Sequence, residues 1–150
     1  MNVFYQKPAI TREIVMKMLD AACEQATKLG VPVNVAITDD GGNVKGFVRM
    51  DGAPLLSSEI AQNKAYTASA FGIATSEWYP LIEKEPPLLH GIVHTNRLTI
   101  FEGGIPIYIN GQLAGGIGVS GGTAEQDGLC AAKALEVFNQ SLNLEKETTK

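Results

Sequence analysis

A short glycine-bearing segment near the C-terminus, QLAGGIGVS (residues 112–120), restricts the fold of this chain more than any other stretch. It follows Asn110-Gly111, which is the strongest two-residue signal for a β-hairpin, so it is expected to pair with the preceding strand IPIYI. Its glycines at 115, 116 and 118 remove side-chain bulk from part of the sheet. The segment therefore predicts a hairpin strand with a bare patch that another backbone, a ring or a flat ligand can approach.

The residues after this strand, GGTAEQDG (121–128), indicate a helix start rather than a phosphate loop. Thr123 and Gln126 match a Thr-x-x-Gln capping box, and Glu125 and Asp127 put negative charge where the helix dipole favours it. These acids would repel an anion, and the segment completes neither a dinucleotide fingerprint nor a P-loop. The letters around Ser120 also match G-x-S-x-G, but both histidines precede this serine in the chain, which disfavours a hydrolase.

The apolar periodicity of the whole chain predicts an α+β fold in the order αββααβββα. The strands form hairpins without a βαβ repeat, so we expect one five-stranded antiparallel sheet flanked by helices. The prolines at 80, 86 and 87 should break a short helix into a fragment and a rigid loop that covers one end of a pocket. The expected elements are a helix over 11–30, a hairpin over 33–50, helices starting at the capping serines 57 and 58 and near 75, strands over 97–101, 105–109 and 112–120, and a helix over 123–142.

Composition and charge indicate one globular domain over residues 1–150, with a core at about 8–140 and a charged, frayed tail at 141–150. Hydrophobic residues make up 45% and charged residues 19% of the chain, and the net charge of -4 argues against nucleic acid or anionic membranes as partners. Cys23 and Cys130 lack a CxxC spacing and are expected to be buried thiols in a reducing compartment. Without a secretory leader or an apolar run of about 20 residues, a cytoplasmic location is expected.

Four motifs together resemble the GlcG/HbpS-like haem-binding family, which includes the C-terminal domain of PduO-type cobalamin adenosyltransferases. They are AITDDGGNVKGFVRMDGA, NKAYTA, GGIPIYINGQLAGGIGVSGG and GVSGGTAEQDG, and they span most of residues 8–140 in family order. The resemblance implies a profilin-like layout with helices on both sides of a five-stranded sheet, assembly into dimers or larger homo-oligomers, and haem as a ligand of some members. The chain departs from the family at Glu102, where a glycine is usual.

The clearest candidates for chemistry are His90, His94 and Glu102. Histidines four residues apart can share one helix face and bind a metal, with Glu102 or Glu85 as a third ligand, or one of them can ligate haem iron. Gly91 and the upstream prolines disfavour a helix there, so ordinary loop histidines without a role are the favoured interpretation and no metal site is predicted.

The expected function is small-molecule binding by an oligomeric protein, with haem as a possible cofactor. Lys64 follows Ile60 by one helical turn, so it either faces a cleft as a carboxylate partner or snorkels to the surface, which is the commoner outcome. The first alternative is an auxiliary catabolic enzyme for a small carboxylated intermediate, with Glu102, His90 or His94 as general acid or base. The second is a ligand-free accessory subunit whose pocket is filled by Phe71, Trp78 and Phe101. The predicted ligand-binding residues are Lys64, Thr67, Arg97, Gly103, Gly104 and Ser120.

Overall fold

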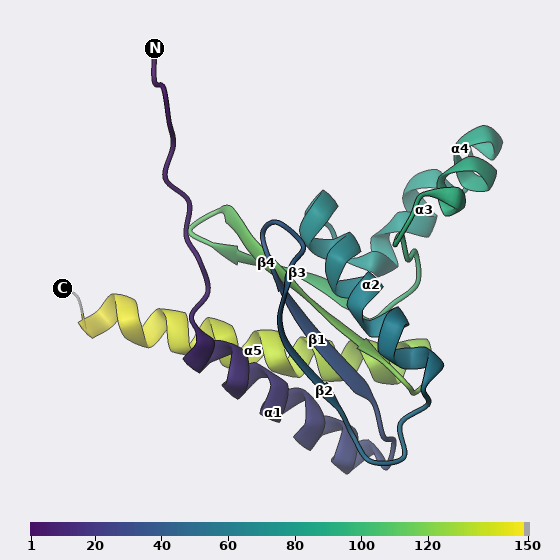
Figure 1. The fold of residues 1–150 in the computed structure, drawn as a ribbon, viewed down its shortest axis with the longest axis horizontal. Helices are drawn as coiled ribbons and strands as arrows, with labels where there is room; N and C mark the ends of the chain where they lie inside the picture. Colours follow the sequence, from purple (N-terminus) through teal and green to yellow (C-terminus); the bar gives the residue numbers. More distant parts are fainter. Residues whose placement is uncertain (149–150) are drawn as a thin grey trace.

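The computed structural model describes residues 1–148. Figure 1 shows a single sheet with helices on both faces and a helical lobe that projects from one end. The two longest helices are α1 and α5, and the lobe is formed by the short segments η1 to η2 between α2 and β3. The elements are α1 (Arg12–Leu29), β1 (Asn34–Asp39), β2 (Val44–Arg49), α2 (Leu56–Phe71), η1 (Thr75–Glu77), α3 (Trp78–Ile82), α4 (Pro86–Gly91), η2 (Ile92–His94), β3 (Gly104–Ile109), β4 (Gln112–Ser120) and α5 (Ala124–Thr148).

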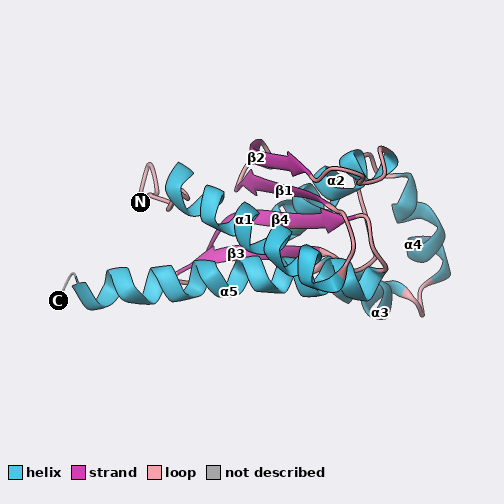
Figure 2. Ribbon diagram, turned by 90° about the horizontal axis from the view of Figure 1, so that it is seen from below, coloured by secondary structure: helices cyan, strands magenta, loops and turns pink. Residues whose placement is uncertain are grey.

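The four strands pair antiparallel in the order β2-β1-β4-β3. Helices α1 and α5 lie side by side on one face of the sheet and α2 lies on the other, as Figure 2 shows. The main core lies between the sheet and the α1–α5 pair, where fully buried aliphatic side chains such as Met18, Ile37 and Ile117 meet. The predicted α+β class is confirmed, and it places the glycines of β4 under α2.

The caps predicted from sequence hold α1 and α5 in place. The Ile14 N–H donates to Thr11 Oγ1, and Gly30 ends α1 in a left-handed conformation. At the start of α5, the Gln126 N–H donates to Thr123 Oγ1 and the Thr123 N–H donates to Gln126 Oε1. This reciprocal pair is the capping box that the sequence predicts.

The predicted strand over residues 97–101 is wrong, so the sheet has four strands rather than five. Arg97 adopts a positive φ of 67°, which breaks an extended run. The Thr99 N–H donates to the Thr67 side chain on α2 instead of to a neighbouring strand. The alternation of apolar residues therefore does not produce a strand here, because Thr67 of α2 binds the Thr99 N–H that a neighbouring strand would otherwise accept.

Three other expectations about element ends are corrected by the structure. Ser57 and Ser58 lie inside the first turn of α2, and its N-cap is Leu55, which makes no side-chain cap. Pro86 occupies the first turn of α4, where a missing N–H costs nothing, so the 86–91 segment is helical rather than a loop. The predicted charged tail continues α5 as far as Thr148, and residues 149–150 lie outside the described part. None of the helices within residues 1–148 is long and apolar enough to cross a membrane.

Two of the three glycines of the bare patch of β4, Gly116 and Gly118, are covered by the backbone of α2, whereas a Cβ on Gly115 would lie 2.2 Å from the Thr38 carbonyl oxygen. A Cβ on Gly116 would lie 2.4 Å from the Ala65 carbonyl oxygen, and a Cβ on Gly118 would lie 2.0 Å from that of Ala61. The small residues Ala61 and Ala65 are fully buried at this contact. The patch is therefore an intramolecular helix–strand contact, and the possibility of a ligand on it is excluded by the packing.

Both cysteines are free thiols on helices, as expected, but only Cys130 is fully buried while Cys23 is half-buried. Burial raises the pKa of the Cys130 thiol to about 11 from its usual 9.0. At pH 8 we expect iodoacetamide to leave Cys130 unmodified in the folded protein and to label it in urea, as measured by peptide mass spectrometry. Equal labelling rates in both states would contradict this placement.

The same shift predicts how stability depends on pH. Because the pKa of Cys130 is raised in the folded state, its contribution to stability is fully present below pH 9 and is lost as the pH rises through about 11. The Cys130→Ala variant should show a smaller loss over this range than the parent protein, as measured by urea unfolding at each pH.

Candidate functional site

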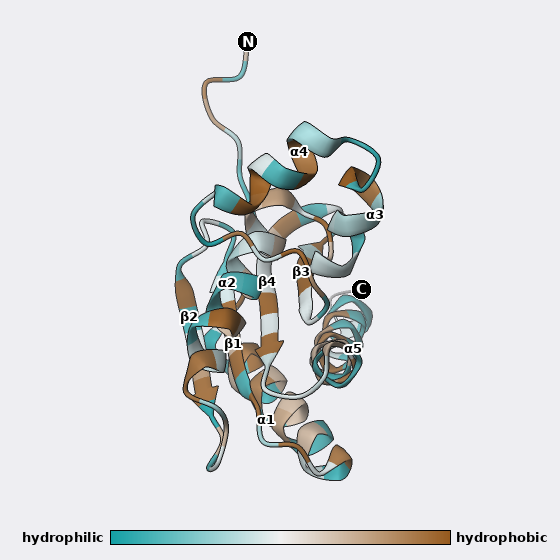
Figure 3. Ribbon diagram, turned by 90° about the vertical axis from the view of Figure 1, so that its right-hand side faces the viewer, coloured by the Kyte–Doolittle hydropathy of each residue, from teal (hydrophilic) through white to brown (hydrophobic). Residues whose placement is uncertain are grey.

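An apolar cavity of about 240 Å³ lies between the C-terminal half of α2 and the helical lobe. Aromatic side chains form much of its wall, and Figure 3 shows apolar stretches of α3 and α4 in the same lobe. The lining residues are Tyr66, Thr67, Ala70, Phe71, Trp78, Ile92, Thr95, Asn96 and Leu98. Of the region that the prolines were expected to make into a pocket cover, residues 75–91, Trp78 lines the cavity and the proline-bearing segment 79–91 does not.

The indole of Trp78 is the chemically distinctive part of this wall. Trp78 is only 4% exposed, and its ring centroid lies 4.6 Å from that of Phe71 in a tilted arrangement. Among the described residues, its Nε1 is the one fully buried side-chain nitrogen or oxygen without a hydrogen-bond partner. Buried indole N–H groups normally find an acceptor. This N–H is closed off from solvent, so Trp78 lines the cavity with its other atoms.

Polar contacts from α2 fix the backbone that follows η2 beside the cavity. The buried Thr67 hydroxyl oxygen lies 2.7 Å from the Asn63 carbonyl oxygen and 3.1 Å from that of Arg97, and it accepts from the Thr99 N–H at 3.0 Å. The Arg97 guanidinium lies 3.9 Å above the Tyr66 ring and donates to Asn63 Oδ1. The Tyr66 ring and the Asn63 side chain together hold the Arg97 guanidinium in one position. Thr67 and Arg97, both predicted from sequence, therefore belong to this cavity region, with Thr67 in its wall.

The two predicted histidines lie in the lobe and are exposed. His90 is in α4 and His94 is in η2, on either side of Ile92, which lines the cavity. The expectation that these residues lie in a loop is wrong, because both stand in short helical segments. Within residues 1–148, no group of three His, Cys, Asp or Glu side chains is placed to hold a metal ion, and no hydrogen bond joins either histidine to Glu102.

A second polar cluster surrounds the fully buried Lys64 and is separate from the cavity wall. Lys64 Nζ donates to Asp127 Oδ2 at 2.9 Å and to the Val119 carbonyl oxygen at 2.8 Å, and it lies 5.0 Å from the centre of the Phe101 ring. Burial lowers the pKa of Lys64, while Asp127 and, more weakly, Glu102 oppose this shift. Neither predicted role of Lys64 holds, because its carboxylate partner is internal and its ammonium does not snorkel to the surface.

The remaining predicted residues pack around this ion pair. The Glu102 carboxylate faces Gly128 at the start of α5, and Gly103 has a positive φ of 123° where a side chain would strike Lys64 Nζ. The Gly104 N–H donates to Thr75 Oγ1, and Ser120 is buried at the end of β4. These residues join α2, β3, β4 and α5 and do not line the cavity.

Sequence reasoning missed the aromatic character of the site and the partner of Lys64. Phe71 and Trp78 were considered as residues that fill a pocket, whereas they line an open one, and Phe101 lies over Lys64 instead. Asp127 was interpreted only as a helix-start charge. The signal that could have revealed it is its position after two glycines at a strand end, because this brings the first turn of α5 against the sheet.

Together the fold and the cavity define a class of α+β proteins with one antiparallel sheet, covered on both faces and carrying a helical lobe. Residues 10–136 match the family model described as "Haem degrading protein HbpS-like". The chain belongs to the HbpS-like family, which confirms the resemblance found in its motifs.

Individual relatives agree with this assignment. The 15.0 kDa protein of the dhaT-dhaS intergenic region of Citrobacter freundii is 40% identical over 142 residues, covering 93% of this chain and 99% of the relative. The crystal structure of Klebsiella pneumoniae protein ORFY superposes with a TM-score of 0.87 at 39% identity, covering 93% and 97% of the two chains. The crystal structure of a PduOC:haem complex superposes with a TM-score of 0.80 at 36% identity, covering 87% and 95%.

Proposed function

We propose that this protein binds a flat, largely apolar small molecule in the cavity between α2 and the helical lobe, and that haem is the first candidate. The observation that carries the proposal is the aromatic wall of this cavity. Such a wall suits a planar, largely apolar ring. A cytoplasmic homo-oligomer remains part of this proposal.

Haem is supported by a relative and by the residues around the cavity. The PduOC structure is a haem complex, and this chain offers Tyr66, Phe71 and Trp78 as ring contacts. Its cavity of about 240 Å³ is smaller than the roughly 300–1,000 Å³ typical of ligand sites, so only one edge of a porphyrin fits inside. His90 or His94 would supply an axial nitrogen and Arg97 a cation for a propionate. When bound, haem would add redox-active iron to a chain that lacks a metal site of its own among residues 1–148.

Haemin titration tests this proposal. We expect a saturable, shifted Soret band for the parent protein and at least about tenfold weaker binding for Ala70→Phe, because the new ring fills the cavity from an exposed position in its wall. Trp78→Phe keeps an aromatic side chain in the wall but removes the five-membered ring with its N–H, so it should weaken binding less. The matched control is Phe101→Ala, which removes a half-exposed aromatic ring outside the cavity and should leave affinity unchanged.

The histidines are tested in the same titration. If one of them ligates the iron, His90→Ala or His94→Ala shifts the Soret maximum of the complex, whereas the other substitution does not. A parent spectrum that stays like free haemin rejects haem as the ligand. Equal affinities of Ala70→Phe and the parent protein would place the bound haem outside this cavity.

A further inference from the structure

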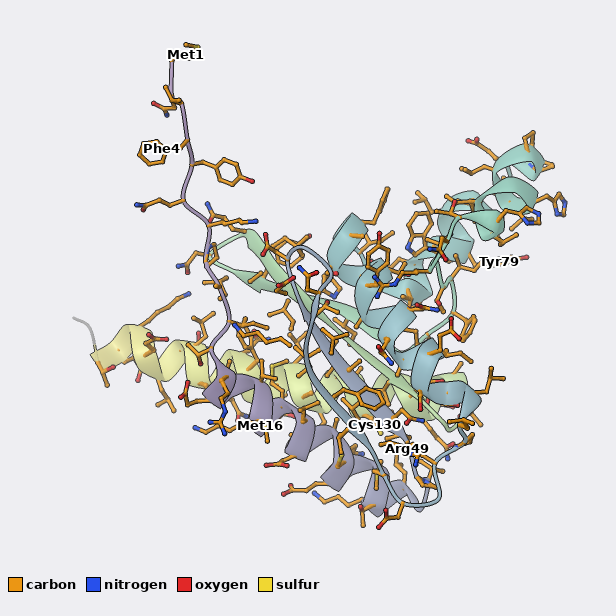
Figure 4. All side chains as sticks on the ribbon, in the orientation of Figure 1. Met1, Phe4, Met16, Arg49, Tyr79 and Cys130 are labelled. Carbon is orange, nitrogen blue, oxygen red and sulfur yellow. The ribbon has the colours of Figure 1, made fainter. Side chains whose placement is uncertain are left out.

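The first residues of the chain form an extended arm whose apolar side chains are largely exposed. Val3, Phe4 and Tyr5 are 90%, 78% and 79% exposed. Figure 4 shows Met1 and Phe4 on the arm, well away from the sheet and from both long helices. Exposing three consecutive large apolar side chains on a projecting extended segment to water costs free energy. The arm therefore lacks the surface that would bury it.

Contacts at the base of the arm hold it in this direction. Lys7 forms an ion pair with Asp40 in the turn between β1 and β2, and the Lys45 ammonium donates to the Ile10 carbonyl oxygen. A shallow hollow of about 330 Å³ beside Tyr5 and Lys7 is completed by Asp40 and by the first two residues of β4, Gln112 and Leu113. Figure 1 shows the arm leaving α1 and running past this end of the sheet, away from α5. These anchors oppose folding back across the arm's own helices.

On the other side of the arm's base lies a groove, open among the described residues 1–148, that apolar and polar side chains line. It has a volume of about 430 Å³ and runs between the first turns of α1, the end of β3 and the second half of α5. Its apolar members include Pro8, Ile10, Ile14, Ile109, Phe138 and Leu142. Groove and arm share one polypeptide junction at residues 8–10, so both lie at the same end of the molecule.

We propose that the arm of one copy, residues 1–6, docks in the α1–α5 groove of a second copy. The arm carries exposed apolar side chains, and the groove has apolar side chains on its floor. Each chain has one arm and one groove, so in a two-fold dimer each arm can occupy the groove of the other copy. Six extended residues reach about 20 Å, enough to cross from one molecule to its neighbour. The inference specifies the homo-oligomer of the proposed function, and it does not depend on the identity of the ligand.

Paired cysteine variants test this docking in the full-length chain. In a Cys23→Ser background, Phe4→Cys and Leu142→Cys chains mixed under mild oxidation should give a disulfide-linked heterodimer on non-reducing gels. Phe4→Cys mixed with Leu129→Cys, an exposed position of α5 outside the groove, is the matched control and should not cross-link. One chain carrying both Phe4→Cys and Leu142→Cys should also yield covalent dimers.

The outcomes separate the possible occupants of the groove. A fast-migrating monomer with an internal disulfide in the double variant would show that the arm folds back onto its own molecule and would overturn the proposal. Phe4→Ser should raise the dimer dissociation constant at least about tenfold by light scattering, as for a buried aromatic anchor. An unchanged constant, with no mixed cross-link, would equally overturn it. Because haemin affinity is read separately, either result leaves the ligand proposal independently testable.

Discussion

Replacement of Lys64 by methionine is expected to lower the free energy of unfolding by about 3–5 kcal/mol. The Lys64 side chain is fully buried and that of Asp127 is 4% exposed, so the substitution leaves a carboxylate in the interior without its counter-charge. It also leaves the Val119 carbonyl oxygen without its donor from Lys64. The loss is measured by urea unfolding at neutral pH, with the slope checked to be unchanged.

Two controls show whether burial is the cause of this loss. Lys133→Met removes an ion pair with Glu136 whose side chains are 37% and 49% exposed, and it should cost less than about 1 kcal/mol. Adding Asp127→Asn to Lys64→Met removes the stranded charge and can keep the acceptor for the Gly122 N–H, so part of the stability should return. Equal costs for the Lys64 and Lys133 variants would mean that the Lys64 pair is not a buried one.

The sequence-based fold was correct where local chemistry and tertiary packing agreed. The caps at Thr11 and Thr123, the hairpin turn at Asn110-Gly111 and the amphipathic helices follow from short-range rules, and the structure has all of them. The segment 97–101 failed because its alternation matched a strand while its Thr99 N–H was bound by the hydroxyl of Thr67, 32 residues earlier. A pattern of apolar residues does not reveal a competing side-chain acceptor on another element.

The site was harder to predict than the fold, because its residues come from segments that the sequence separates. The cavity needs Tyr66 from α2, Trp78 from α3 and Leu98 from the segment after η2. Periodicity assigns each residue to an element, but it does not show that the lobe turns back over α2. Lys64 illustrates the same limit, since its partner Asp127 is 63 residues away and its environment depends on four elements.

The glycines of β4 gave the strongest sequence signal, and the structure assigns them to packing rather than to a ligand. Gly116 and Gly118 let the α2 backbone approach the sheet closely enough to hold Lys64 over the end of β4. The same helix carries Tyr66 and Thr67 into the cavity wall. The bare patch therefore sets the position of α2, and with it the position of the cavity wall, against the sheet.

Gly118→Ala is therefore expected to be among the most disruptive single-methyl substitutions in the chain. The added Cβ would lie 2.0 Å from the Ala61 carbonyl oxygen and 2.5 Å from the Ala65 nitrogen, and both are backbone atoms that cannot rotate aside. Helix α2 must move away from β4, which opens the contact at Ala61 and Ala65 and strains the Lys64 ion pair. We expect a loss of about 3 kcal/mol or more in urea unfolding, at the upper end of overpacking costs, together with weaker haemin binding.

Gly91→Ala is the matched control, because a Cβ at this α4 position meets nothing within 4 Å and the residue has an ordinary helical φ of -87°. Alanine there should leave stability unchanged or raise it slightly, since it favours the helix more than glycine does. The comparison keeps the chemical change constant and varies only the space around it. A loss of less than about 1 kcal/mol for Gly118→Ala would mean that the overpacking cost is missing. Together with haemin binding like that of the parent protein, it would show that the close contact between α2 and β4 does not position the cavity wall.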